Sequence, residues 1–111
     1  MAGDSLSQKL QALADPTRRG MLARLAQGQA TVNELARPFD ISLPAISKHV
    51  KVLEKAGLIT RSRSAQQRPC QLSSDGLKEI EDWMSAYRAM WEHKLDRLET
   101  YLANLTREEK S

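Results

Sequence analysis

The chain has 111 residues, a formal net charge of +3 and 41% hydrophobic residues, enough for one small domain with a modest core. No apolar run approaches the roughly 18 residues needed to cross a bilayer, and the first 13 residues lack the pattern of a signal peptide. The single cysteine, Cys70, excludes an internal disulfide and suits a reducing compartment. We therefore expect a single-domain cytoplasmic protein without a membrane partner.

Two short helices are predicted at the start of the chain. Leu6, Leu10 and Leu13 recur at helical spacing in the first helix, which should end where Asp15 precedes Pro16. Asp15 can cap a second helix, with Pro16 at the first helical position where its missing N–H costs nothing. The second helix should end at the glycine at position 28.

A third short helix and a fourth, basic helix follow. Thr31 and Glu34 form a capping box, which opens the third helix and carries it to about residue 37. Ser42 caps the fourth helix after a short turn. Two helices joined by a turn of about four residues, the second of them basic, are typical of a helix-turn-helix.

The fourth helix has two distinct faces. Ile46, Val50 and Leu53 fall on one side of the helical wheel and should pack inward. The opposite side carries Pro44, Lys48, Lys51 and Lys55. Such a helix can pack on one face and meet an anion on the other.

A basic hairpin is predicted directly after this helix. Gly57 should end the helix, and residues 58–60 and 70–72 read as short strands around Arg61, Arg63 and Arg68. Residues 42–71 hold six basic side chains against Glu54 alone, whereas residues 72–111 hold nine acidic and six basic ones. This local excess of positive charge favours contact with phosphate, although a solvated helix face is the plain alternative.

These stretches resemble the ArsR/SmtB family of winged helix-turn-helix repressors. The similarity rests on ALADPTRR at residues 12–19, NELA at 33–36 and the stretch from Ser42 to Leu58, with its ISKHVKVLEKAGLI run at 46–59, in the expected order. The resemblance covers most of residues 6–73. It implies a mostly α-helical fold with a small β-hairpin wing, a homodimer formed through terminal helices, and a recognition helix beginning at Ser42.

The predicted site is therefore a surface for double-stranded DNA. Ser47 and Lys48 are best placed for base edges or phosphate, and His49 is predicted either to pack and hydrogen-bond or to touch DNA. The wing arginines should meet the backbone or the minor groove. The predicted DNA-binding residues are Ser42, Pro44, Ala45, Ser47, Lys48, His49, Lys51, Arg61, Arg63 and Arg68.

A long helix from about residue 75 to 105 should form the dimer. Apolar residues recur every seven positions along it, and at roughly 45 Å it would be longer than a domain of this size is wide. A second copy is the natural cover, although an intramolecular core helix is the alternative. The predicted interface residues are Leu6, Leu10, Leu77, Met84, Trp91, Leu98, Leu102 and Leu105. We thus expect a DNA-binding core at 5–74, a dimerisation helix at 75–106 and an inverted-repeat operator.

The sequence does not specify what regulates such a repressor. Metal-sensing family members often carry a Cys-x-Cys pair before the recognition helix, and residues 33–37 contain none. His93 with Asp96 and Glu99 could supply part of a zinc site, and Cys70 could be oxidised, but each set is incomplete. We therefore predict no metal and no cofactor, and the effector stays unknown.

Other functions are weighed against DNA binding. Trp83, Tyr87, Met90 and Trp91 could line a pocket for an organic effector, although such aromatics more often form interface core. A winged helix can also bind a partner protein instead of DNA. The sequence offers no Gly-rich phosphate loop, no metal pair and no nucleophile with an evident base, so an enzyme is not expected.

Overall fold

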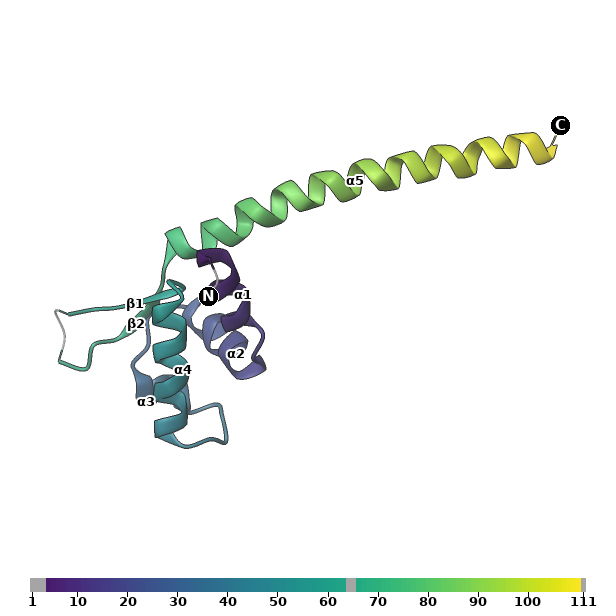
Figure 1. Ribbon diagram of the computed structural model, residues 1–111. Helices are drawn as coiled ribbons and strands as arrows, with labels where there is room; N and C mark the ends of the chain where they lie inside the picture. The colour runs from purple at the N-terminus through teal and green to yellow at the C-terminus, as the bar shows by residue number, and fades with distance from the viewer. Residues whose placement is uncertain (1–3, 64–65, 111) are drawn as a thin grey trace. The chain divides into compact units, whose positions relative to one another are not determined.

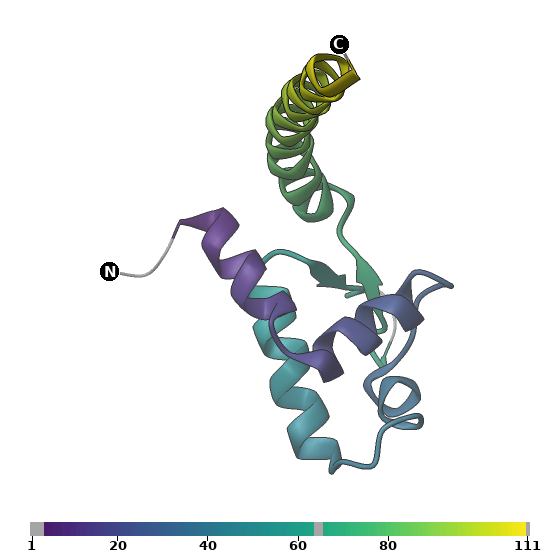
Figure 2. The same cartoon turned by 90° about the vertical axis from the view of Figure 1, so that its right-hand side faces the viewer.

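The computed structural model describes residues 4–63 and 66–110, with side chains as far as residue 108. Figure 1 shows the elements in chain order, and Figure 2 shows them after a quarter turn. The chain divides after residue 80 into two units, which we describe separately. The elements are α1 (Ser5–Leu13), α2 (Pro16–Leu25), α3 (Val32–Ala36), α4 (Leu43–Lys55), β1 (Ile59–Arg61), β2 (Cys70–Leu72) and α5 (Ser74–Lys110).

Helices α2, α3 and α4 begin at the predicted caps. The Asp15 carboxylate accepts from the Arg18 amide at 2.9 Å, and the Ser42 hydroxyl accepts from the amide of Ala45 at 3.3 Å. The capping box of α3 is complete, since both its side chain to backbone hydrogen bonds form. The amide that donates to Asp15 also lowers the pKa of that carboxyl group. These caps confirm that short side chain to backbone bonds fix where each helix starts.

Two predicted helix ends differ slightly from the structure. Helix α2 ends at Leu25 instead of Gly28, because residues 26–28 form a final turn in which the Gly28 amide donates to the Leu25 carbonyl oxygen. Gly28 has a φ of 145°, so it redirects the chain just after that turn. Helix α5 starts one residue before the predicted long helix and continues beyond residue 105.

The first unit has one hydrophobic core, to which α1, α2, α3, α4 and the hairpin contribute. Met21, Leu35, Ile46, Leu53 and Leu58 are all fully buried in it. The inward positions predicted for α4 are therefore confirmed, and burial of such side chains stabilises the fold by about 1.5–3 kcal/mol each. Leu6, Leu13, Leu22 and Leu77 pack against the edge of this core.

Strands β1 and β2 form the wing. They pair antiparallel with Ile59 opposite Leu72 and Arg61 opposite Cys70. The first strand is thus one residue later than the predicted run at 58–60. Cys70 also bridges to Ala30 through two backbone hydrogen bonds of 2.7 and 3.0 Å, which tie the base of the wing to the segment before α3. Figure 1 shows the hairpin extending away from the helices of this unit.

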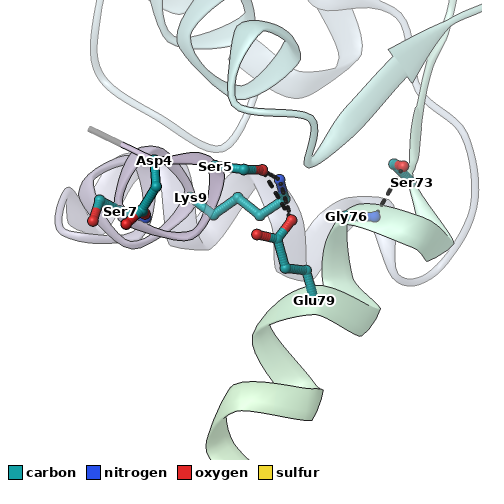
Figure 3. Close-up of polar contacts among 7 residues, drawn as sticks. All are labelled: Asp4, Ser5, Ser7, Lys9, Ser73, Gly76 and Glu79. Atoms are coloured by element: carbon teal, nitrogen blue, oxygen red, sulfur yellow. Dashed lines mark hydrogen bonds and ion pairs between the residues drawn. The ribbon is translucent and has the colours of Figure 1, made fainter. Parts of the chain in front are cut away.

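A tight backbone approach joins α5 to the end of α4. Gly57 follows α4 with a φ of 81°, a conformation that glycine adopts without strain. Gly76, in the first turn of α5, is buried against the Gly57 carbonyl group, and a Cβ atom there would collide with it. The Gly76 amide donates to the Ser73 hydroxyl at 3.4 Å, as Figure 3 shows. Gly76 therefore allows α5 to start directly against this turn.

A buried lysine completes this junction. The Lys9 ammonium group donates to the Ser5 hydroxyl at 2.7 Å and lies 3.0 Å from the Glu79 carboxylate, which also accepts from Ser5 at 2.9 Å (Figure 3). Only 5% of the surface of Lys9 is exposed, so its charge requires such partners. Lys9 thus ties α1 to the first turns of α5.

The second unit is the remainder of α5, from residue 81 onward. Every described side chain between residues 81 and 108 is exposed in the single chain. Trp83, Tyr87 and Trp91 contact one another at four-residue spacing, with ring centroids 5.5 and 6.1 Å apart, and Lys94 lies over the last ring. Within the described residues no helix is both long enough and apolar enough to cross a membrane.

Candidate nucleic-acid interface

Helix α4 presents a cationic face to solvent. Lys48, Lys51 and Lys55 are exposed on the side opposite the buried residues, as the wheel predicts. Among the residues that the structure describes, these three ammonium groups have no hydrogen-bond or ion-pair partner. They are therefore available to an anionic partner, and phosphate oxygens are suitable acceptors for them.

The first turn of α4 is open to a partner. Ser42 and Pro44 are exposed, and Ala45 and Ser47 are half-buried. Leu43 was not predicted as a site residue, yet 46% of its surface is exposed. This turn therefore offers an apolar side chain, which could contact a thymine methyl group, and a hydroxyl group, which could bond to a base edge or a phosphate.

His49 does not share the outward face of the lysines. Its Nδ1 lies 3.2 Å from the Arg18 Nη1 on α2, and the residue is half-buried. This contact agrees with the packing and hydrogen-bonding alternative. Sequence reasoning missed Arg18, because its partners on α1 and α4 lie outside any local pattern.

The three wing arginines differ in their surroundings. Arg61 is half-buried and donates from Nε to the Arg68 carbonyl oxygen at 3.1 Å, so it helps to hold the hairpin together. Arg68 adopts a φ of 46°, a left-handed conformation at the return toward β2. Arg63 and Arg68 are exposed. The wing therefore offers two accessible guanidinium groups, with the third near its base.

Cys70 is poorly suited to redox sensing. Its side chain is fully buried, and this burial raises the pKa of the thiol, although the nearby Arg61 partly opposes the effect. Only the thiolate reacts readily with oxidants, so both burial and the raised pKa disfavour the reaction. The structure thus supports a packing role for Cys70 in β2.

The candidate zinc residues do not form a cluster within the chain. His93 and Asp96 border a shallow surface hollow on α5 together with Arg97 and Thr100. Across the residues with described positions, no group of three or more His, Cys, Asp or Glu side chains lies close enough to hold a metal ion.

Comparisons with known proteins agree with this arrangement. A helix-turn-helix domain family matches residues 13–62. The transcriptional repressor SdpR of Bacillus subtilis is 34% identical over 79 residues, which cover 71% of this chain and 88% of SdpR. The chain belongs to the ArsR/SmtB family. The crystal structure of an ArsR family transcriptional regulator matches with a TM-score of 0.73 and 42% identity over 80% of this chain and 98% of that one.

A mycobacterial relative has higher identity over a shorter stretch. The HTH-type transcriptional regulator Rv2034 of Mycobacterium tuberculosis is 48% identical over 67 residues, which cover 60% of this chain and 63% of that protein. These family relatives are transcriptional regulators and not enzymes. The predicted winged helix-turn-helix fold and family are therefore confirmed.

Proposed function

We propose that this ArsR/SmtB family member is a transcriptional repressor that binds a specific double-stranded DNA operator as a homodimer. The observation that carries the proposal is the unpaired cationic face of α4, capped at Ser42 and backed by a fully buried apolar face. SdpR, which is 34% identical to this chain over 79 residues, is named a transcriptional repressor. A DNA partner would place its action in the cytoplasm.

Helix α4 would enter the major groove with its first turns at the bases. Ser47 and Lys48 would reach base edges or phosphate, while Lys51 would contact phosphate further along the helix. Arg63 and Arg68 would meet the backbone or minor groove from the wing. Since each phosphate contact releases counterions, affinity should fall steeply as salt increases.

Helix α5 would form most of the dimer interface. Its apolar side chains recur with a seven-residue period and are about half exposed in the single chain, for example Trp91 at 47% and Leu98 at 51%. An apolar stripe of this length exceeds what a soluble monomer usually leaves in water. A second copy would cover it and place two α4 helices about a two-fold axis, which predicts an inverted-repeat operator.

The test is fluorescence anisotropy of the purified protein with the DNA upstream of its own gene and with a scrambled duplex, across a salt series. We expect tight, salt-sensitive binding to the upstream DNA only. Lys48→Ala should lower the salt slope by about one if Lys48 contacts phosphate, or cost about 1–3 kcal/mol and alter base preference if it contacts guanine. Lys78→Ala is the matched control, because Lys78 is an exposed lysine at the start of α5.

Three outcomes contradict parts of this proposal. Equal affinity for both duplexes would show that the protein does not recognise the sequence of the upstream DNA. Weak binding to every duplex, with little salt dependence, would favour a protein-interaction module instead. Equal behaviour of the Lys48→Ala and Lys78→Ala variants would remove Lys48 from the interface.

A further inference from the structure

Arg18 links three helices through one residue. Its Nε donates to the Ala12 carbonyl oxygen at 2.7 Å and its Nη2 to the Gln11 carbonyl oxygen at 3.2 Å, at the C-terminal end of α1. Its Nη1 lies 3.2 Å from Nδ1 of His49 on α4. Its own amide donates to Asp15 at the start of α2. The middle of α4 is therefore tied to the two helices that pack behind it.

The chemistry of this contact defines the protonation state of His49. A guanidinium group has five N–H donors and no acceptor. His49 Nδ1 must therefore accept, which leaves the ring neutral with its proton on Nε2. Protonation would place a hydrogen on Nδ1, remove the acceptor and bring two cations together. The bond between Arg18 and His49 can exist only while His49 is neutral.

A lysine of α4 also lies near this pair, because Lys55 lines the same surface hollow as Arg18. On α2, the Arg18 amide, which donates to the Asp15 carboxylate, is the main cause of the lowered pKa of that carboxyl group, and the charge of a protonated His49 would lower it further, as does the Arg18 charge. On α1, Lys9 bonds with Ser5 and Glu79. The charged groups of α3 and β1 also have other partners, since Glu34 caps α3 and Arg61 bonds within the wing. A protonated His49 would thus be repelled by Arg18 and attracted by Asp15.

We propose that Arg18 is a positioning residue for DNA binding and that its bond to neutral His49 forms a pH-sensitive joint, which holds α4 in the orientation that fits the major groove. The inference rests on the DNA-binding function proposed above. Acidification breaks the joint, and operator affinity falls. The direction is diagnostic, because a histidine that met phosphate directly would bind DNA more tightly when protonated.

The test compares operator affinity at constant salt between about pH 8 and pH 5.5, the range in which histidine changes charge. We expect wild-type affinity to fall about tenfold on acidification, within the usual range of coupling between two sites. The asparagine in His49→Asn keeps an oxygen that can accept from Arg18, but it does not titrate. The operator affinity of this variant should therefore change little between pH 8 and pH 5.5. His93→Asn is the matched control, because the chain has two histidines and His93 is exposed on α5.

Two results would refute the proposed pH-sensitive bond between Arg18 and His49. One is a wild-type pH dependence that persists in His49→Asn, and the other is affinity that rises on acidification. Arg18→Met should weaken binding about tenfold at pH 8 and also remove most of the pH dependence. Unchanged affinity in that variant would show that Arg18 does not position α4.

A measurement without DNA separates this inference from the proposed function. In a double-mutant cycle of Arg18→Met and His49→Leu, urea unfolding should reveal coupling of about fivefold in the unfolding equilibrium constant at pH 8 and almost none at pH 5.5. Coupling between Arg18 and His49 without specific DNA binding would refute the proposed function but support the pH-sensitive bond between the two residues. Absence of coupling at pH 8 would refute the joint even if the protein bound its operator.

Discussion

The glycine at the start of α5 gives a stability prediction that follows directly from backbone geometry. A Cβ atom at position 76 would collide with the Gly57 carbonyl oxygen and lie 2.8 Å from its carbonyl carbon and 3.4 Å from the Leu58 Cα. All three are backbone atoms of the turn after α4, so none can move by changing rotamer. Overpacking of this kind usually costs about 1–3 kcal/mol. We expect Gly76→Ala to lower the free energy of unfolding by about 2 kcal/mol.

Gly20→Ala is the matched control. A Cβ atom at position 20 would lie 2.9 Å from Cζ and 3.0 Å from Cε1 of Phe39. Those atoms are the far end of a half-buried side chain, which can shift by the few tenths of an ångström required. Alanine is also about 1 kcal/mol better than glycine inside a helix such as α2. Gly20→Ala should therefore be neutral or slightly stabilising.

The assay is urea unfolding followed by circular dichroism, with all variants at one protein concentration, because the stability of an oligomer depends on concentration. The two alanine variants should differ by about 2–3 kcal/mol in the free energy of unfolding. Equal stability of Gly76→Ala and Gly20→Ala would refute the reasoning, since it would mean that the turn yields as easily as a phenylalanine ring.

Three further predictions concern α5, its junction with α1 and the wing. Leu98→Lys should halve the mass measured by light scattering and abolish tight operator binding, whereas Ala103→Lys, off the apolar stripe, should leave both unchanged. The bonds from Lys9 and Ser5 lower the pKa of Glu79 below its usual 4.5, so their stabilisation is present above that value and lost as pH falls through the lowered pKa. Replacing Glu79 with Gln should therefore lower the free energy of unfolding, measured in urea, at neutral pH, and this loss should vanish once the pH has fallen below the lowered pKa of Glu79. Cys70 should react with a thiol reagent only on unfolding, and Cys70→Ala should retain operator affinity; rapid reaction of the native protein would contradict its burial.

Local signals explain why the helix starts and the inward face of α4 could be predicted. A cap such as Asp15 or Ser42 acts on an amide within three residues, and the buried face follows from the helical repeat. The wheel gives the direction of a side chain but not how far the neighbouring elements extend along the helix. Leu43, in the first turn of α4, is consequently 46% exposed, whereas Ile46, one turn later, is fully buried.

The remaining features depend on contacts between residues that are distant in the chain. Arg18 meets His49 across 31 positions, and Ser5 meets Glu79 across 74. No local repeat or propensity encodes such pairs. Gly76 illustrates the same limit, because a glycine in a first helical turn is unremarkable until the Gly57 carbonyl is found against it.

These long-range contacts hold α4 at two points. Arg18 fixes the middle of α4 through His49, and Gly76 packs against the turn at the C-terminal end of α4. The lysines that would meet DNA have no partners of their own within the described residues, so their positions depend on how these two points orient the helix. Operator affinity should therefore respond to Gly76→Ala, which disturbs the end of α4, more than to Gly20→Ala, whose added atom meets a movable ring.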